Sequence, residues 1–262
     1  MSFAGLLTTS RPLQGADGFG VTVPDTWLQG RTAYGGLSAA LALEAAKRLD
    51  ASLPPLRSAQ IAFVGPVAEE IEVRPRLLRK GRNATWIAVE VGGKKGTGLV
   101  ATFVFMNALP SETRVAPPGP PADLIPAGQA ALAESGLRPA FLRGHFETRF
   151  ALPRQQEQEP EICLWVRLRE REGFDPETEL MLVGDALPPA VLPVMAQPGP
   201  ISSMTWQVNL LAAPFTANAG GWWLLRSRAD EAASGTSSQH MMLWDEAGRA
   251  CASGTQTVAV FA

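Results

Sequence analysis

The sequence predicts an α+β protein made of two copies of one unit, in which an antiparallel sheet wraps around a central helix. Three observations carry this prediction. The 262 residues are 46% hydrophobic and 18% charged, so each copy has enough apolar material for a buried core. Six prolines between positions 110 and 126 interrupt the chain near its middle. On each side of this segment, the same order of one helix followed by four strands recurs.

The first copy begins with a predicted helix over 37–49, because Leu37, Leu41, Ala45 and Arg48 recur at helical spacing among alanines. Gly35 and Gly36 precede it. The strands that we expect to follow, by their extended or alternating hydrophobic pattern, are Leu56–Pro66, Ile71–Leu78, Thr85–Val91 and Leu99–Met106.

The second copy repeats this order. Pro188 and Pro189 suit the first turn of a helix, which we expect over 190–196, after Asp185. The predicted strands of this copy are Ser203–Pro214, Gly221–Arg228, Ser237–Trp244 and Cys251–Phe261. Pro214 follows Pro66 by 148 residues and Phe261 follows Phe105 by 156, and this nearly constant offset indicates a duplication.

The proline-rich segment divides the chain, because proline lacks the amide hydrogen that helices and sheets require. We therefore expect an N-terminal unit over 1–109, a linker rich in proline and alanine over 110–140, and a C-terminal unit over 141–262. A sheet curved around a helix rich in small residues is the pattern of a hotdog fold. The prediction is a double hotdog with two antiparallel sheets, each around its own helix, that pair as a pseudo-dimer.

Composition excludes several classes of protein. A formal net charge of −2, with no run of Lys or Arg, predicts neither a nucleic-acid partner nor an anionic membrane surface. No apolar stretch approaches the roughly 18 residues of a membrane span, and the N-terminus lacks a basic segment, so we expect a cytoplasmic protein. Cys163 and Cys251, and the two distant histidines, have no ligand spacing, so no metal site is expected.

Several short motifs in the second half resemble those of the acyl-CoA thioesterase II family, whose members are double hotdogs. They are, in order, His145-Phe-Glu-Thr-Arg149, Leu164-Trp-Val-Arg-Leu-Arg169, Leu182-Val-Gly-Asp185 and Ala252-Ser-Gly-Thr-Gln256. In the first half, the resemblance depends on the Gly35-Gly36 helix, the strand end Phe63–Pro66 and Lys80-Gly-Arg-Asn83. It covers nearly the whole chain.

This resemblance implies that an Asp, a Thr or Ser, and a Gln hold a water that attacks the thioester carbonyl of an acyl-CoA. The matching positions are Asp185, Ser203 and Gln256, with Thr205 as the reserve hydroxyl and Ser202 close by. Strand alternation places Ser203 and Thr205 on one face. The resemblance further implies a homo-oligomer that needs no cofactor, since coenzyme A is part of the substrate.

The chemistry of these residue types agrees with that role. Asp185, expected at a helix N-terminus, would be ionised at neutral pH and act as a weak base, although an Asp there is equally a helix cap. Gln256, by pattern alone, is a polar residue on an exposed edge strand. Gly35 and Gly36 are packing glycines whose helix N-terminus could also bind a carbonyl or phosphate oxygen of the substrate.

Two other functions stay open at this point. One is a non-catalytic hotdog that binds acyl-CoA or another lipid, and the other is a hotdog hydratase that uses His145 or His240. The coenzyme A phosphates would need basic neighbours. The candidates by charge are Arg57, Lys80, Arg82, Lys94 and Lys95.

Overall fold

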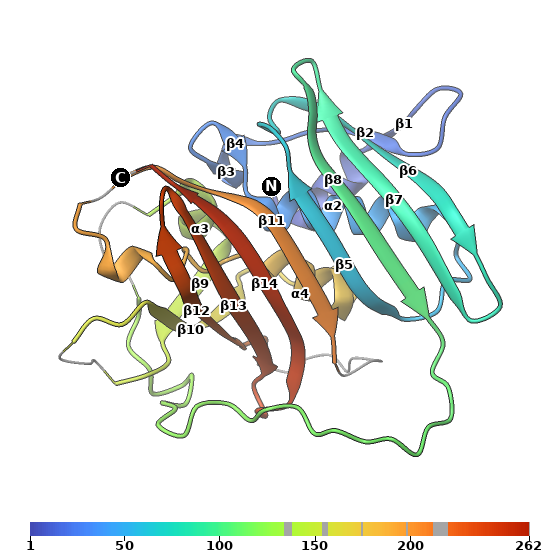
Figure 1. Ribbon diagram of the computed structural model, residues 1–262. Helices are drawn as coiled ribbons and strands as arrows, with labels where there is room; N and C mark the ends of the chain where they lie inside the picture. Colours follow the sequence, from blue (N-terminus) through green and yellow to red (C-terminus); the bar gives the residue numbers. More distant parts are fainter. Residues whose placement is uncertain (134–137, 154–156, 174, 198, 212–219, 262) are drawn as a thin grey trace.

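The computed structural model of the chain describes residues 1–133, 138–153, 157–173, 175–197, 199–211 and 220–261. Within them, a 12-stranded antiparallel sheet carries two central helices on one face, as Figure 1 shows. The end of the strand predicted over Ser203–Pro214, from position 212 onward, lies outside the described residues, as do residues 134–137 of the predicted linker.

The first half follows the predicted order of elements. Its bounds are α1 (Phe3–Thr9), β1 (Arg11–Pro12), β2 (Phe19–Thr22), the 3-10 turn η1 (Asp25–Trp27), β3 (Leu28–Gln29), β4 (Thr32–Ala33), α2 (Gly35–Leu49), β5 (Leu56–Phe63), β6 (Glu70–Lys80), β7 (Ala84–Gly93) and β8 (Gly96–Met106). The predicted helix and the four predicted strands are confirmed, with ends that differ by three residues at most.

The second half also has its predicted strands. Its bounds are α3 (Ala140–His145), β9 (Phe146–Phe150), β10 (Glu161–Leu168), α4 (Pro176–Gly184), the 3-10 turn η2 (Leu192–Val194), β11 (Ile201–Leu210), β12 (Trp223–Ala233), β13 (Thr236–Asp245) and β14 (Ala250–Val260). The stretch from 110 to the start of α3 forms no helix or named strand in its described residues.

The helix predicted over 190–196 is wrong. The central helix of this half is α4, which ends at Gly184, and only a 3-10 turn forms at 192–194. The carboxylate of Asp175 accepts hydrogen bonds from the backbone N–H groups of Glu177 and Thr178, and Pro176 occupies the first helical position. The start signal of the helix is therefore this Asp-Pro pair.

The prediction of two separate sheets is also wrong. The strand order is β1-β2-β6-β7-β8-β5-β11-β14-β13-β12-β10-β9, so the halves join through antiparallel pairing of β5 with β11. Read from its outer end, β2-β6-β7-β8-β5 in one half corresponds to β10-β12-β13-β14-β11 in the other, which agrees with a duplication. The edge strand of each half satisfies its backbone groups on the other half, and one continuous sheet results.

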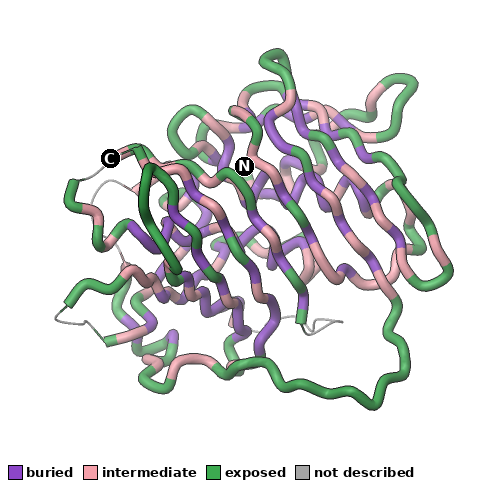
Figure 2. The backbone as a smooth tube through the Cα atoms, viewed as in Figure 1, coloured by how far each residue is buried: buried purple, intermediate pink, exposed green. Residues whose placement is uncertain are grey.

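The main core lies between this sheet and the helices. Ala39, Ala40 and Leu41 of α2 are fully buried, and α2 packs against α4 as well as against β6, β7 and β8. In Figure 2 the buried residues run along these helices and alternate along the strands. Small side chains on α2 permit this close approach.

A second apolar cluster covers the opposite face of the sheet in the C-terminal half. It joins Trp165 and Trp244 to residues of the predicted linker. The indole nitrogen of Trp165 donates to the carbonyl of Ile125 at 2.7 Å, and that of Trp244 donates to the carbonyl of Pro118 at 3.0 Å. The segment between the halves is thus packed against the sheet from about Pro118 to Ala130, and this part covers some of the sheet face.

Candidate active site

Asp185 lies where the two halves meet, directly after the last residue of α4. Its Oδ1 accepts a hydrogen bond of 2.6 Å from Nε2 of Gln256 on β14. Its carboxylate also accepts the backbone N–H of Gly36, in the first turn of α2. Residues from α2, α4 and β14 therefore converge on one carboxylate, and each half contributes to the site.

The predicted pair Gly35 and Gly36 permits this convergence. A Cβ on Gly35 would overlap Oδ2 of Asp185 and come within 2.9 Å of the ring of Phe63. A Cβ on Gly36 would lie 2.7 Å from the carbonyl oxygen of Leu182. Both distances are shorter than a side chain tolerates. At this helix N-terminus, the oxygen bound by Gly36 is that of Asp185 itself.

Tyr34 holds the two helices in register, and the sequence analysis did not identify it. Its fully buried hydroxyl donates to the carbonyl of Leu182 at 2.9 Å, and its ring stacks on Phe141. Burial raises the pKa of Tyr34 well above its ordinary value, and the charge of Asp185 raises it further. The signal in the sequence was the position of the chain's one tyrosine, immediately before the two glycines.

The protonation of Asp185 differs from the prediction. We expected a low pKa at the N-terminus of its own helix, but Asp185 follows the C-terminus of α4. Burial raises the pKa of Asp185 to about 7, although the hydrogen bonds from Gln256 and Gly36 act to lower it. The cost of removing the carboxylate from water exceeds the stabilisation by the N-terminus of α2. A base with a pKa near the working pH is well suited to proton transfer.

Gln256 lies in the interior of the sheet, between β11 and β13, and is 4% exposed. Its pattern-based interpretation as an exposed edge residue is therefore wrong. The Oε1 of Gln256 accepts a hydrogen bond of 2.8 Å from Nε2 of Gln239 on β13. Gln239 in turn accepts the backbone N–H of Ala190 at 2.8 Å. Sequence reasoning missed Gln239, which is polar at a buried position of an alternating strand.

The candidate hydroxyls separate because of a β-bulge. The register of β11 against β14 shifts between Ser203 and Thr205, so these two residues do not share a face as alternation predicted. Ser203 pairs with Val258, which lies on the same buried face as Gln256. Thr205 pairs with Thr257 on the opposite face and is exposed, as is Ser202 on its own strand. Ser203 thus shares the sheet face of Gln256, and Thr205 does not.

Gly184, the residue before Asp185, packs under Trp206. A Cβ at this position would lie 2.9 Å from Cζ2 of the indole ring. Trp206 pairs with Gln256 across the ladder and is buried. A glycine is therefore needed for the end of α4 to approach the sheet, and this approach sets the position of Asp185 relative to Gln256.

Neither histidine joins this cluster. His145 stacks on Trp27 with ring centroids 3.6 Å apart, and its Nε2 lies 3.1 Å from the hydroxyl of Thr26. Burial lowers the pKa of His145 to about 4. His240 follows Gln239 on β13 and so points to the opposite face, where it is exposed and pairs with Asp230 at 2.7 Å. The geometry does not favour a histidine-dependent hydratase.

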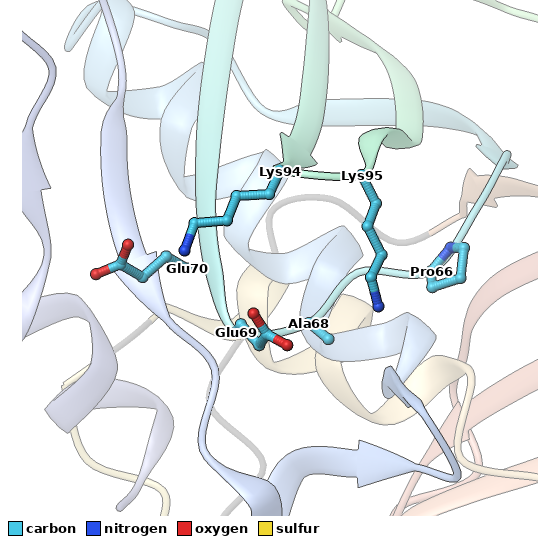
Figure 3. A pocket seen from close by; sticks show the side chains of 7 residues that line it. Pro66, Ala68, Glu69, Glu70, Lys94 and Lys95 are labelled. Carbon is cyan, nitrogen blue, oxygen red and sulfur yellow. The ribbon is translucent and has the colours of Figure 1, made fainter.

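Two of the five basic candidates lie at the same end of the fold as Asp185. Lys94 and Lys95 line a small pocket with Pro66, Ala68, Glu69, Glu70 and Gly93. Figure 3 shows both lysine side chains there, with Lys94 pointing toward Glu70. The loop between β5 and β6, which forms one side of this pocket, also contacts the residues before α2, since the backbone N–H of Ala33 donates to the carbonyl of Val67. Lys80, by contrast, pairs with Asp50, just beyond the far end of α2.

In the part of the chain that the structure describes, no group of three or more His, Cys, Asp or Glu side chains is arranged to hold a metal ion. None of the helices formed by these residues has both the length and the apolar character needed to cross a membrane. Both cysteines are buried free thiols.

Comparison with known proteins identifies the family. Residues 23–106 match the model of the acyl-CoA thioesterase N-terminal domain, and residues 110–260 match that of the acyl-CoA thioesterase C-terminal domain. The chain belongs to the acyl-CoA thioesterase family. It is therefore a thioester hydrolase, and its two matched domains correspond to the two halves of the sheet.

Solved structures share the fold of this thioesterase along its whole length. A conserved hotdog protein of unknown function from Alicyclobacillus acidocaldarius has a TM-score of 0.85 at 21% identity, with 100% of this chain and 99% of that chain covered. A putative thioesterase II from Thermobifida fusca has a TM-score of 0.83 at 23% identity, with 99% and 97% covered.

An acyl-CoA thioesterase II from Mycobacterium marinum has a TM-score of 0.73 at 16% identity, with 99% of this chain and 97% of that chain covered. Among curated proteins, none matches the thioesterase. At these identities the solved structures support the double hotdog fold, while the two matched domain models carry the assignment to the family.

Proposed function

We propose that the protein hydrolyses an acyl-CoA to free coenzyme A and a carboxylic acid, using a water held by Asp185, Gln256 and Ser203. The observation that carries this proposal is the 2.6 Å hydrogen bond between Gln256 and Asp185 at the junction of the halves. It joins the two residues whose motifs resemble those of the family, 71 positions apart in the chain.

In this reaction Asp185 is the general base. Its carboxylate takes a proton from the water as the water oxygen forms a bond to the thioester carbonyl carbon. The carbon–sulfur bond then breaks as the carbonyl re-forms, and the sulfur leaves as a thiolate that takes the proton from Asp185, which gives the thiol and restores the carboxylate. Water is the direct nucleophile, so no covalent enzyme intermediate forms.

Gln256 and Ser203 orient the water. The amide nitrogen of Gln256 donates to Asp185 and holds the carboxylate facing the sheet. Ser203 lies on the same sheet face, opposite Val258, where its hydroxyl can donate to or accept from a water. Thr205, on the other face, has no part in this mechanism.

No cofactor is needed in this mechanism, and coenzyme A enters as part of the substrate. Its phosphates would bind near Lys94 and Lys95, at the end of the fold where α2 begins. The proposal includes self-association of the chain into a homo-oligomer, which light scattering after size-exclusion chromatography would test.

The test is release of free thiol from a panel of acyl-CoAs that runs from short to long chains and includes aryl-acyl groups. We expect turnover by the wild type and a loss of about 100-fold or more in Asp185→Asn, because the base is removed. The matched control is Asp230→Asn, which removes an exposed carboxylate from the opposite face of the sheet. Acyl-CoA binding without any turnover would replace the proposal by a non-catalytic binder.

A further inference from the structure

We propose that Gln239 is a positioning residue of this active site, which sets the orientation of the Gln256 amide through a directional chain of hydrogen bonds. The inference rests on the proposed function, since it concerns the same carboxylate. Gln239 lies on β13, directly across the ladder from Gln256, and it is 1% exposed. Its side chain bonds to Gln256 and to the backbone of Ala190, so it acts on Asp185 through Gln256.

The direction of the chain follows from its first donor. A glutamine side chain has an oxygen that only accepts and a nitrogen that only donates. The backbone N–H of Ala190 can only donate, so it selects the oxygen of Gln239. The nitrogen of Gln239 then faces Gln256 and selects its oxygen. The nitrogen of Gln256 is left to face Asp185, where it donates.

Burial fixes the orientation of both glutamine amides. Gln239 and Gln256 are both almost completely buried, so the loss of one partner leaves a polar atom without a hydrogen bond, which costs free energy. Without the donor of Gln239, nothing fixes the orientation of the Gln256 amide, and the amide can turn over when the Asp185 carboxyl is protonated. Its oxygen would then face Asp185 and accept a hydrogen bond from the protonated carboxyl. Gln239 therefore favours the ionised form, which is the form that acts as the base.

The chain of hydrogen bonds also attaches the polypeptide segment 185–190 to the sheet. Ala190 is buried and follows Asp185 by five residues, so the two glutamines bind both ends of the segment 185–190 to the sheet. Besides Gln256, the donor to the carboxylate is the N–H of Gly36, whereas the nearby phenol of Tyr34 donates to the carbonyl of Leu182. Among the described residues, no charged side chain is a cause of the pKa shift of Asp185. Its protonation thus depends on burial and on these donors.

The first experiment compares Gln239→Met, Gln256→Met and the double variant, because methionine matches glutamine in length but has no strong donor or acceptor. Gln207→Met is the control, since Gln207 lies on the opposite face of the sheet and bonds to Ser58. We expect Gln239→Met to lower kcat about 10-fold with KM little changed. This loss is a part of the rate enhancement that a positioned general base gives. The double variant should be no slower than Gln256→Met.

The second measurement does not depend on turnover. Titration of the Asp185 carboxyl by carbon-13 NMR should give a higher pKa in Gln239→Met than in wild type, as in Gln256→Met. If Gln239→Met does not fold, Gln239→Glu keeps the acceptor for Ala190 and lacks a hydrogen for Gln256 when ionised. Where its own carboxyl is ionised, this variant should show the same rise in the pKa of Asp185.

Wild-type kcat in a folded Gln239 variant, an unchanged pKa of Asp185, or losses that multiply in the double variant would each overturn the inference. A raised pKa in Gln239→Met together with no hydrolysis by the wild type would retain the positioning role and overturn the proposed function instead. The two failures are therefore distinguishable.

Discussion

The carboxylate of Asp185, just beyond the C-terminus of α4, accepts a hydrogen bond from the backbone N–H of Gly36 in the first turn of α2. The candidate base of the C-terminal half is thus held by the helix N-terminus of the other half. Neither half contains the whole site, so the site forms only when the two halves are packed together.

Gly35→Ala should abolish most of the activity, because the new Cβ would overlap Oδ2 of Asp185 and press on Phe63. We expect a destabilisation of about 1–3 kcal/mol from overpacking and at least a 10-fold loss of kcat. Gly128→Ala is the control, since a Cβ there meets no atom within 4 Å. Thermal melts and thiol release measure the two effects, and a fully active Gly35→Ala would contradict the described contact.

The activity should rise with pH through about 7. Asp185 acts as a base only when ionised, and burial raises its pKa to about 7. The measurement is kcat/KM for one acyl-CoA between pH 5 and pH 9. A flat profile over this range would show that a group other than Asp185 limits the reaction.

The free energy of unfolding should depend on pH in the opposite direction to the activity, because of the same residue. The pKa of Asp185 is about 7 when folded and near 3.9 when unfolded, so the folded state holds the extra proton between these values. The contribution of Asp185 to the free energy of unfolding therefore decreases as pH rises from about 4 to about 7. Asp185→Asn should gain stability relative to wild type over this window, by denaturant unfolding at pH 5 and pH 8. Equal differences at both pH values would contradict the raised pKa.

His145 should destabilise the protein in acid. Burial lowers its pKa to about 4, below the value of 6.5 of a free histidine, so the unfolded state takes up the proton first. The contribution of neutral His145 to the free energy of unfolding is complete above pH 6.5. It is lost as pH falls toward 4, and the loss is at most about 3 kcal/mol. His145→Phe retains a ring against Trp27 and should remove this part of the acid sensitivity. The same variant should keep its kcat, because His145 lies outside the Asp185 cluster.

Lys94 and Lys95 should affect substrate binding and not chemistry. Replacing both by Ala should raise KM for an acyl-CoA about 10-fold at low salt and leave kcat unchanged, because only the phosphates would contact them. The corresponding acyl-pantetheine, which lacks the nucleotide, should show no difference. Lys80→Ala, at the far end of α2, is the matched control. Equal effects on both substrates would place the phosphates elsewhere.

The elements of the fold were largely predictable. The helix α2 and the strands β5 to β8 and β11 to β14 follow from hydrophobic periodicity, which is a local property of the chain. The location of α4 was missed, because Pro188 and Pro189 were interpreted as the helix start and the pair Asp175 and Pro176 was not. The capping Asp175, Pro176 and the glutamates of the first turn are the fuller local signal for a helix start, and the helix that they begin packs against α2.

The candidate site was predictable in part. Motif resemblance selected Asp185 and Gln256, and the structure brings them into contact. Gln239 has no such motif, because a buried glutamine on an alternating strand becomes recognisable only when its neighbour across the ladder is known. The bulge after Ser203 does not interrupt the alternating pattern of the sequence, so alternation assigned Ser203 and Thr205 to one face.

By itself, the sequence determined the duplicated unit, the order of the strands along the chain and the small residues of α2, and it selected Asp185 and Gln256 as candidate site residues. The tertiary structure decided that the two half-sheets join through β5 and β11, that Tyr34 bonds to Leu182 across 148 positions, and that the pKa of Asp185 is near 7. The reason is physical. Propensity and periodicity act over a few neighbouring residues, whereas desolvation and contacts between the halves exist only after the two helices have packed together.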